Sequence, residues 1–273
     1  MTVDLSDSLE TVADVSPLVT AITNNVTVND VAQVILHWGG LPVMSDDKRE
    51  VSEMMAAAQA CLLNMGTVSE QGEQTMLAAG TAANERSIPV VVDPVGVGAT
   101  PTRDSVATRL ATELDVAILK GNYGEVTAMA GEEADVRGVE SVGEYSDIAT
   151  TAVACAQRYD TVVVASGETD LVATADAAYE ITAGNPTMGA VVGTGCMLGA
   201  TLAVFAAAID DPLAAALTGT AAYGVAGELA AEGAFGDYRG PASYKTAFLD
   251  AVAGLAEAST PDIADRIDRI EVR

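Results

Sequence analysis

Residues 188–208 read MGAVVGTGCMLGATLAVFAAA, a glycine-rich turn that leads directly into an apolar, alanine-rich segment with helical composition. Glycines just before a helix let the backbone bend where a side chain would clash. The first amides of such a helix have no intrahelical partners, and they lie at the positive end of its dipole. The turn is therefore suited to bind phosphate, or the charge that develops on a phosphoryl group during transfer.

Cys196 falls in the first turn of this expected helix. The field of the helix favours a thiolate at that position. The alternative interpretation is a tight turn before a buried helix, with Cys196 as a small apolar side chain. Both interpretations stay open on this segment alone, because short glycine motifs are weak evidence.

Length and composition restrict the class of protein. The chain has 273 residues without an internal repeat or a linker-like segment, so one domain over residues 1–273 is the simplest interpretation. No segment approaches about 18 uninterrupted apolar residues, so we expect no transmembrane helix. The acidic N-terminus, MTVDLSDSLE, lacks the apolar core of a secretion signal. The three cysteines, Cys61, Cys155 and Cys196, lie far apart and predict a reduced, cytoplasmic protein.

The formal net charge of −26 excludes a general affinity for nucleic acid, which needs a basic surface. The single histidine, His37, makes a histidine-based triad or a multi-histidine metal site hard to build. We expect His37 and Trp38 to pack at a helix end. The hydrophobic content of 49% is too high for a disordered acidic chain. The pattern indicates a folded protein from a salt-rich cytoplasm, where screening weakens self-repulsion.

Apolar strand-like segments alternate with amphipathic helix-like segments over most of the chain. Such alternation predicts an α/β fold with a mostly parallel sheet covered by helices on both faces. The expected strands are 21–27, 41–44, 60–65, 88–94, 116–120 and 161–166, followed by a hairpin of 170–174 with 178–182 and an edge strand at 268–272. The expected helices are 28–38, 48–58, 70–86, 102–114, 122–130, 146–158, 196–208, 212–231, 242–256 and 261–266.

Polar side chains fall where several expected strands end, and ligands of open parallel sheets bind outside those ends. Asp93 and Glu125 offer the hard oxygen ligands that magnesium with a nucleoside triphosphate needs, and Lys120 could neutralise a phosphate. Taken singly, Asp93 is a turn acid, Glu125 a first-turn helix acid and Met44 a core residue. The other polar residues at such ends are Asn24, Ser45, Asn64, Asn122, Ser166 and Glu168. Their convergence at one edge of a sheet favours a binding site.

Eight segments between residues 23 and 196 resemble a known family in order and spacing. They are 23–24 (with Asn29 further on), 40–44, 63–67, 89–100, 119–125, 137–141, 165–170 and 193–196. The family that they resemble is the hydroxyethylthiazole kinases, within the ribokinase-like superfamily. The DPVGVGAT segment at 93–100 occurs in related kinases too. The GTGC turn at 193–196 is more specific, because most superfamily relatives carry an acid where Cys196 stands.

The resemblance implies a ribokinase-like fold and a reaction in thiamine synthesis or salvage. The enzyme would transfer the γ-phosphoryl group of ATP, with Mg2+, to the primary alcohol of 4-methyl-5-(2-hydroxyethyl)thiazole. The resemblance also implies a homotrimer with pockets between subunits.

The resemblance assigns roles to individual positions. It places Asn24, Met44 and Gly193 at the thiazole, Lys120, Asn122 and Ser166 at ATP, and Asp93 and Glu125 at magnesium and phosphate. The amides of Thr194, Gly195 and Cys196 would hold the transferring group. Cys196 would either take the alcohol proton or orient the hydroxyl.

The sequence departs from the family pattern at a few positions. Lys120 stands where the family usually has arginine, which removes a bidentate phosphate contact, and Ser166 replaces a usual threonine. Residues 37–39 (HWG) replace a plainer apolar stretch. Two other functions stay open: a ribokinase-like kinase for hydroxymethylpyrimidine or a similar small alcohol, and a non-catalytic thiazole or nucleotide binder. Cys196 disfavours the first, and the presence of Asp93, Glu125 and the GTGC turn disfavours the second.

Overall fold

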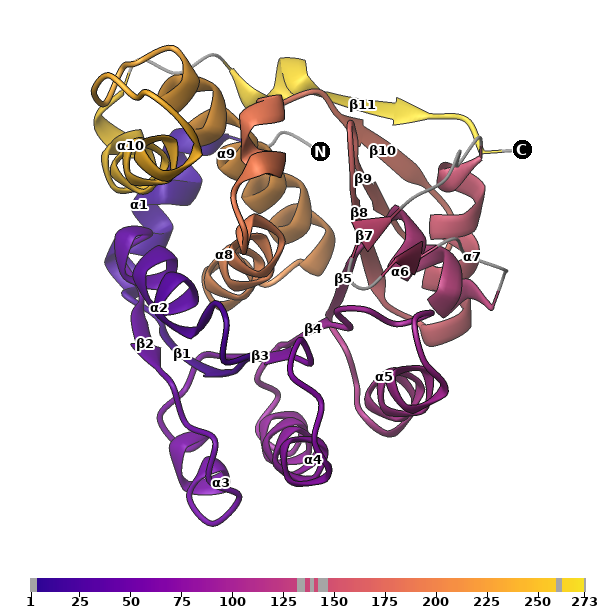
Figure 1. Ribbon diagram of the computed structural model, residues 1–273. Helices are drawn as coiled ribbons and strands as arrows, with labels where there is room; N and C mark the ends of the chain where they lie inside the picture. Colours follow the sequence, from indigo (N-terminus) through magenta and orange to yellow (C-terminus); the bar gives the residue numbers. More distant parts are fainter. Residues whose placement is uncertain (1–3, 132–135, 138–139, 142–146, 259–261, 273) are drawn as a thin grey trace.

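A sheet of nine strands forms the centre of the protein (Figure 1). The computed structural model describes residues 4–131, 136–137, 140–141, 147–258 and 262–272. The strand order is β11-β10-β9-β8-β5-β4-β3-β1-β2. The bounds are β1 Leu18–Ile22, β2 Leu41–Val43, β3 Ala60–Asn64, β4 Val90–Asp93, β5 Ile118–Asn122, β8 Val162–Ser166, β9 Asp170–Ala173, β10 Ala178–Ile181 and β11 Ile267–Ile270.

The six strands from β2 to β8 pair in parallel, and β9, β10 and β11 continue the sheet in antiparallel pairs. The predicted mostly parallel sheet, the hairpin after residue 170 and the C-terminal edge strand are therefore confirmed. A separate small hairpin of β6 Val136–Arg137 and β7 Glu140–Ser141 was not predicted. Gly138 and Val139, which belong to the family-like segment 137–141, lie outside the described residues.

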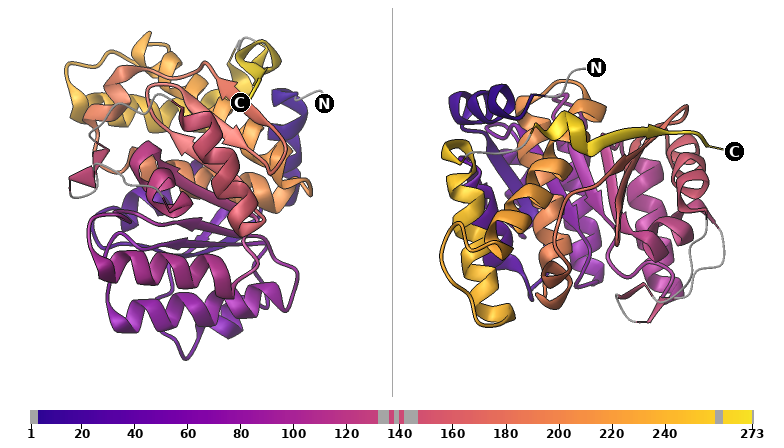
Figure 2. Two further views of the ribbon diagram at one scale, coloured as in Figure 1. Left: turned by 90° about the vertical axis from the view of Figure 1, so that its right-hand side faces the viewer. Right: turned by 90° about the horizontal axis from the view of Figure 1, so that it is seen from above.

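Helices cover both faces of the sheet (Figure 2). One layer holds α1 Leu5–Val15, α2 Val28–His37, α8 Thr194–Ala208, α9 Pro212–Ala231 and α10 Pro241–Gly254. The other layer holds α3 Val51–Met54, α4 Glu70–Asn84, α5 Pro101–Glu113, α6 Tyr123–Ala130 and α7 Ile148–Tyr159. The short 3-10 helices are η1 Pro186–Ala190, η2 Leu255–Glu257 and η3 Ile263–Arg266. Among the described helices, none is both long and apolar enough to cross a membrane.

The inner strands β1, β3, β4 and β8 are apolar over most of their length because successive side chains enter different cores. In β3, Leu62 belongs to the core under α8, whereas Cys61 and Leu63 belong to the core under α4 and α5. Helix α8 is itself surrounded, since every residue from Met197 to Ala206 is buried. A helix that is apolar all round is expected to lie inside a protein. The 188–208 segment thus supplies the central helix of its layer.

Trp38, directly after α2, ties that helix to α8. Its indole Nε1 donates to Thr201 Oγ1 at 2.8 Å, and its ring meets Phe205 edge-on with centroids 5.3 Å apart. The expected packing role of Trp38 at a helix end is confirmed.

Two of the elements expected above differ most from the structure at their ends. The strand expected at 21–27 is β1, which already begins at Leu18 and ends at Ile22. It stops early because the Asn24 side chain accepts the amides of Val26 and Thr27 in a local turn. The helix expected at 48–58 is only Val51–Met54. The amides of Ala56 and Ala57 bond to carbonyls three residues back instead of four, and no side chain caps the start of the helix.

Candidate active site

Four strands end in side chains that form one buried chain of contacts. Asn24 follows β1, Asn64 ends β3, Asp93 ends β4 and Lys120 lies in β5, and none of these side chains is more than 4% exposed. Asn24 Nδ2 donates to Asn64 Oδ1 at 2.9 Å, and Asn64 Nδ2 donates to Asp93 Oδ2 at 2.6 Å. Lys120 Nζ lies 3.5 Å from Asp93 Oδ1. The structure therefore brings together four of the polar residues that the sequence placed at strand ends.

Backbone amides fix the orientation of both asparagines. The amide of Gly66 donates to Asn64 Oδ1 at 3.0 Å, so Asn64 Nδ2 must face Asp93. The amides of Val26 and Thr27 donate to Asn24 Oδ1, each at 3.0 Å. Because a backbone N–H can only donate, the Asn24 NH2 group must face the interior of the site.

Cys196 joins this chain from the first turn of α8. Asn24 Nδ2 lies 3.4 Å from its Sγ, and the side chain is half-buried. Burial and the nearby Asp93 carboxylate raise the pKa of the Cys196 thiol. The raised pKa disfavours the thiolate and favours the alternative interpretation of Cys196 as a small, largely apolar side chain.

Glycines on one side of α8 let the Lys120–Asp93 pair approach the helix. A Cβ on Gly195 would lie 3.0 Å from Lys120 Nζ, and a Cβ on Gly199 would lie 3.3 Å from Asp93 Oδ2. Although burial lowers the pKa of Lys120, the carboxylates of Asp93 and Glu125 raise it overall. A charged ammonium group thus lies beside the first turn of α8.

Glu125 holds two segments of backbone at once. Its Oε1 accepts the Gly96 amide at 2.7 Å, and its Oε2 accepts the Asn122 amide at 2.7 Å. Asn122 Oδ1 accepts the Glu125 amide in return, which completes a capping box at the start of α6. The interpretation of Glu125 as a first-turn helix acid is confirmed. Burial raises the pKa of Glu125 to about 7.

The carboxylates fit a magnesium ion that arrives with a nucleotide. Asp93 and Glu125 are both buried and both face Lys120. Across the described residues, no group of three or more His, Cys, Asp or Glu side chains could hold a metal ion by itself. Magnesium binds through one or two carboxylates together with phosphate oxygens and water, so two carboxylates suffice once phosphates are present.

A cavity of about 770 Å3 opens beside the first turn of α8. Its lining includes Asn122 and Ser166, expected at ATP, and Thr194 and Gly195, expected at the transferring group. Asp170 and Tyr223 also line it, and sequence reasoning missed both. The one available signal for Tyr223 was a single tyrosine within an alanine- and glycine-rich helix.

The three residues expected at the thiazole do not line this cavity. Asn24 contacts Cys196, and Met44 packs half-buried against the core under α8. Gly193 has a φ of +97° and caps α8, and a Cβ there would lie 2.7 Å from Thr27 Cγ2. The residues expected at the thiazole and the residues expected at ATP therefore come together at the first turn of α8.

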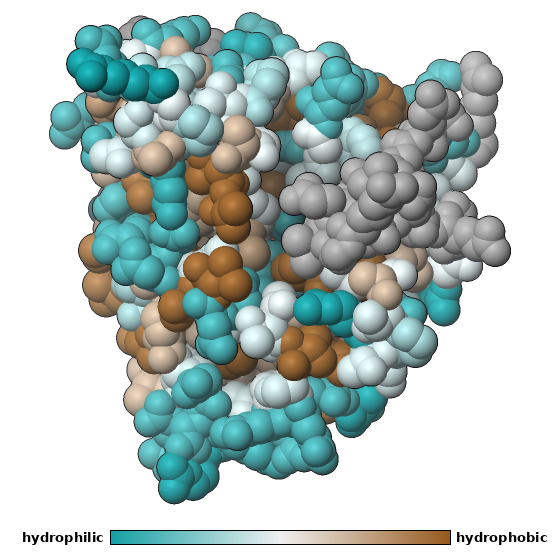
Figure 3. Space-filling view, viewed as in Figure 1, coloured by the Kyte–Doolittle hydropathy of each residue, from teal (hydrophilic) through white to brown (hydrophobic). Residues whose placement is uncertain are grey.

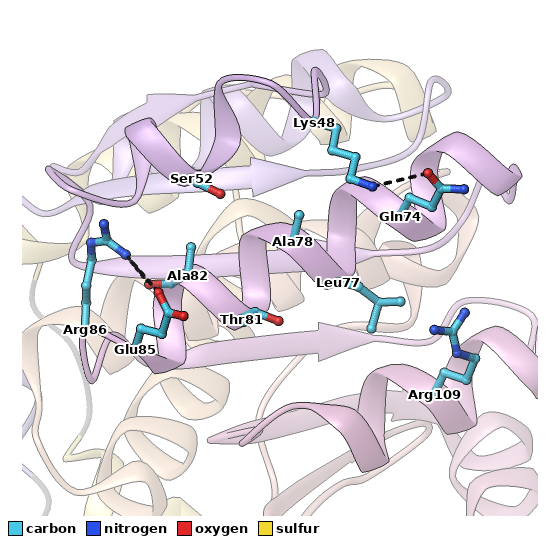
Figure 4. A pocket seen from close by; sticks show the side chains of 10 residues that line it. All are labelled: Lys48, Ser52, Gln74, Leu77, Ala78, Thr81, Ala82, Glu85, Arg86 and Arg109. Atoms are coloured by element: carbon cyan, nitrogen blue, oxygen red, sulfur yellow. Dashed lines mark hydrogen bonds and ion pairs between the residues drawn. The ribbon is translucent and has the colours of Figure 1, made fainter.

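A second cavity, of about 520 Å3, lies between α3, α4 and α5 (Figure 4). Lys48 Nζ donates to Gln74 Oε1 at 3.3 Å, and Arg86 lies 3.9 Å from Glu85. None of the residues expected at a site lines this surface groove. The cavity beside α8 is therefore the better candidate.

Comparison with known proteins identifies the family of the chain. The sequence model of the Hydroxyethylthiazole kinase family matches residues 9–258. The chain belongs to the hydroxyethylthiazole kinase family. It is 66% identical over 270 residues to the hydroxyethylthiazole kinase of Natronomonas pharaonis, covering 98% of this chain and 96% of that protein.

Solved structures support the same family and fold. The hydroxyethylthiazole kinase protein from Pyrococcus horikoshii superposes with a TM-score of 0.84 at 30% identity, covering 98% of this chain and 99% of that one. A ribokinase-like superfamily protein from Enterococcus faecalis gives 0.65 at 12% identity, covering 93% and 95%, which shows the fold alone. The expected ribokinase-like fold is confirmed.

Proposed function

We propose that the protein transfers the γ-phosphoryl group of ATP to the hydroxyl of 4-methyl-5-(2-hydroxyethyl)thiazole, a step of thiamine synthesis or salvage. The observation that carries this proposal is the meeting of Asp93, Lys120 and Cys196 at the first turn of α8 in a member of this kinase family. Residues 1–273 act as one kinase domain, which the continuous nine-stranded sheet supports.

The amides of Thr194, Gly195 and Cys196 hold the oxygens of the group in transfer, because the first amides of a helix lack intrahelical partners. The Lys120 ammonium group beside Gly195 neutralises the charge that develops there. Phosphoryl transfer depends mainly on positioning and on electrostatic stabilisation, and these groups supply both.

Cys196 orients the alcohol rather than acting as its base, because burial and the Asp93 carboxylate raise the pKa of its thiol. Asn24, Met44 and Gly193 bind the thiazole next to it. A strong base is not needed where the transition state is loose and the alcohol loses its proton late.

ATP occupies the cavity beside α8, with Asn122 and Ser166 at the nucleotide. Asp93 and Glu125 hold the magnesium ion, which supplies charge neutralisation for the phosphates when it is bound. Lys120 links the magnesium residues to the amides at the start of α8, because it contacts Asp93 and lies beside Gly195.

A second and third copy of the chain complete the thiazole pocket in a homotrimer. Val26 precedes Thr27 and Val192 precedes Gly193, and Thr27 and Gly193 approach each other closely. Val26 and Val192 are each 74% exposed. Leu36 and Leu41 are exposed as well. Apolar patches also interrupt the hydrophilic surface in Figure 3. Large apolar side chains left exposed can mark a protein interface, and light scattering that gives a monomer mass would contradict the trimer.

The surplus of acidic residues fits a cytoplasm of high salt, and the relative from Natronomonas pharaonis comes from a halophile. The cytoplasmic location stays a prediction.

The proposed function is tested by direct detection of product with purified protein, ATP and magnesium in molar potassium chloride. The hydroxyethylthiazole and the hydroxymethylpyrimidine are offered separately. Thiazole phosphate supports the proposal. Pyrimidine phosphate alone would replace the substrate while the kinase chemistry stands. No product from either alcohol, with ATP still bound, would indicate a non-catalytic binder.

A further inference from the structure

Tyr223 places a buried hydroxyl against the start of the central helix. It lies in the middle of α9, which packs beside α8 (Figure 1), and its side chain is 3% exposed. Its hydroxyl donates to the carbonyl oxygen of Thr194 at 2.7 Å. Its ring meets Phe248 edge-on, with centroids 4.9 Å apart. The ring contact with Phe248 therefore fixes the side chain in the core, and its hydroxyl reaches the first residue of α8.

The carbonyl of Thr194 and the amide of Gly195 belong to one peptide unit. A trans peptide unit is planar, and its C=O and N–H point in opposite directions. A bond that fixes the Thr194 oxygen therefore fixes the direction of the Gly195 N–H. That N–H is one of the amides at the start of α8 that no helix carbonyl can accept, and it lies next to Lys120.

We propose that Tyr223 is a positioning residue, which aims the Gly195 amide at the phosphoryl group in transfer. This inference rests on the function proposed above. The hydroxyl serves as a constant donor, because burial raises the pKa of Tyr223 far above its usual range. A bond donated to a carbonyl also polarises the peptide, which strengthens its amide as a donor.

The chain offers a matched control in Tyr244 of α10. This side chain is fully buried, and its hydroxyl donates to the Gly227 carbonyl at 2.8 Å. Its ring stacks on Phe248, the same residue that Tyr223 contacts, with centroids 6.4 Å apart. Tyr223→Phe and Tyr244→Phe therefore remove the same kind of hydrogen bond from the same core, but only the first bond reaches α8.

The first experiment compares steady-state kinetics and thermal unfolding of both variants in molar potassium chloride. We expect Tyr223→Phe to lower kcat about tenfold, less than the loss of a whole donor in such sites, with little change in KM for either substrate. Tyr244→Phe should leave kcat unchanged, although both variants lose a comparable amount of Tm. Equal kcat values in the two variants would overturn the inference.

The second experiment does not depend on turnover. Labelling of threonine carbonyl carbons and glycine amide nitrogens selects the two Thr–Gly pairs of the sequence, 194–195 and 218–219, in an NMR spectrum. The Gly195 amide signal should move in Tyr223→Phe and stay in place in Tyr244→Phe. A Gly195 signal that ignores Tyr223→Phe would overturn the positioning role, whereas absence of product with the unaltered protein would overturn only the proposed function.

Discussion

Replacement of Gly66 by alanine should push Asn24 out of its position in the site. A Cβ on Gly66 would lie 2.8 Å from Asn24 Cβ and 2.9 Å from its Cγ and Nδ2. Asn24 cannot turn away freely, because its Nδ2 also donates to Thr27 Oγ1 at 2.8 Å and to Asn64 Oδ1 at 2.9 Å. The added methyl group must therefore displace either the Asn24 amide or the backbone that carries Gly66.

The size of the effect follows from two opposed contributions. Overpacking of a buried site costs about 1–3 kcal/mol, and the lower chain entropy of alanine in the unfolded state returns about 0.4–1 kcal/mol. A net loss of about 1–2 kcal/mol lowers Tm by about 2–8 °C in a chain of this size. Displacement of Asn24 should also raise KM for the thiazole alcohol about fivefold, the equivalent of one hydrogen bond, and leave KM for ATP unchanged.

Thermal unfolding and steady-state kinetics with both substrates measure these effects. Gly219→Ala is the control, because a Cβ at this position in α9 meets its nearest neighbours at an ordinary 3.4 Å. Alanine in a helix interior should hold or raise Tm there. If Gly66→Ala left Tm and the thiazole KM as they are, the backbone would absorb the methyl group without moving Asn24, and the reasoning would be refuted.

Three further predictions concern catalysis, pH and salt. Cys196→Ala should lower kcat about tenfold and still form product, because the thiol orients the alcohol through contacts of hydrogen-bond strength; full turnover would remove Cys196 from the mechanism. Burial raises the pKa of Asp170 to about 6, so the stability that its protonated form contributes at low pH is lost as pH rises from about 4 through 6. The Tm of Asp170→Asn should therefore rise relative to that of the unaltered protein over this range, and a constant difference between the two would contradict the role of Asp170. Because the net charge is −26, Tm should rise between about 0.1 M and about 2 M potassium chloride, and equal values would contradict salt adaptation.

The sheet was predictable because its inner strands are buried on both faces. A run such as residues 90–92 (VVV) in β4 has to be apolar, and this pattern is visible without the partner strands. The end of β1 was not visible in the same way. Val26 looks like the continuation of a strand, yet it is exposed, because the Asn24 side chain binds the backbone amides of the next residues.

The site was predictable where it depends on strand ends. Parallel strands place their carboxyl ends at one edge, so Asn64, Asp93 and Lys120 had to lie close together. Tyr223 could not be found this way, because its contact with Thr194 depends on how α9 packs on α8. The sequence left two interpretations of Cys196 open, because its raised pKa follows from burial beside Asp93 and not from the local sequence.

The contact of Trp38 with α8 gives the protein a built-in fluorophore at its centre. Trp38 is the single tryptophan of the chain, so all indole emission comes from this position. The indole is bonded to Thr201 and packed on Phe205, both in the helix whose first turn carries the GTGC amides. Its emission therefore reports whether α8, the helix that carries those amides, is packed against the end of α2. A red shift on heating indicates that this packing is lost.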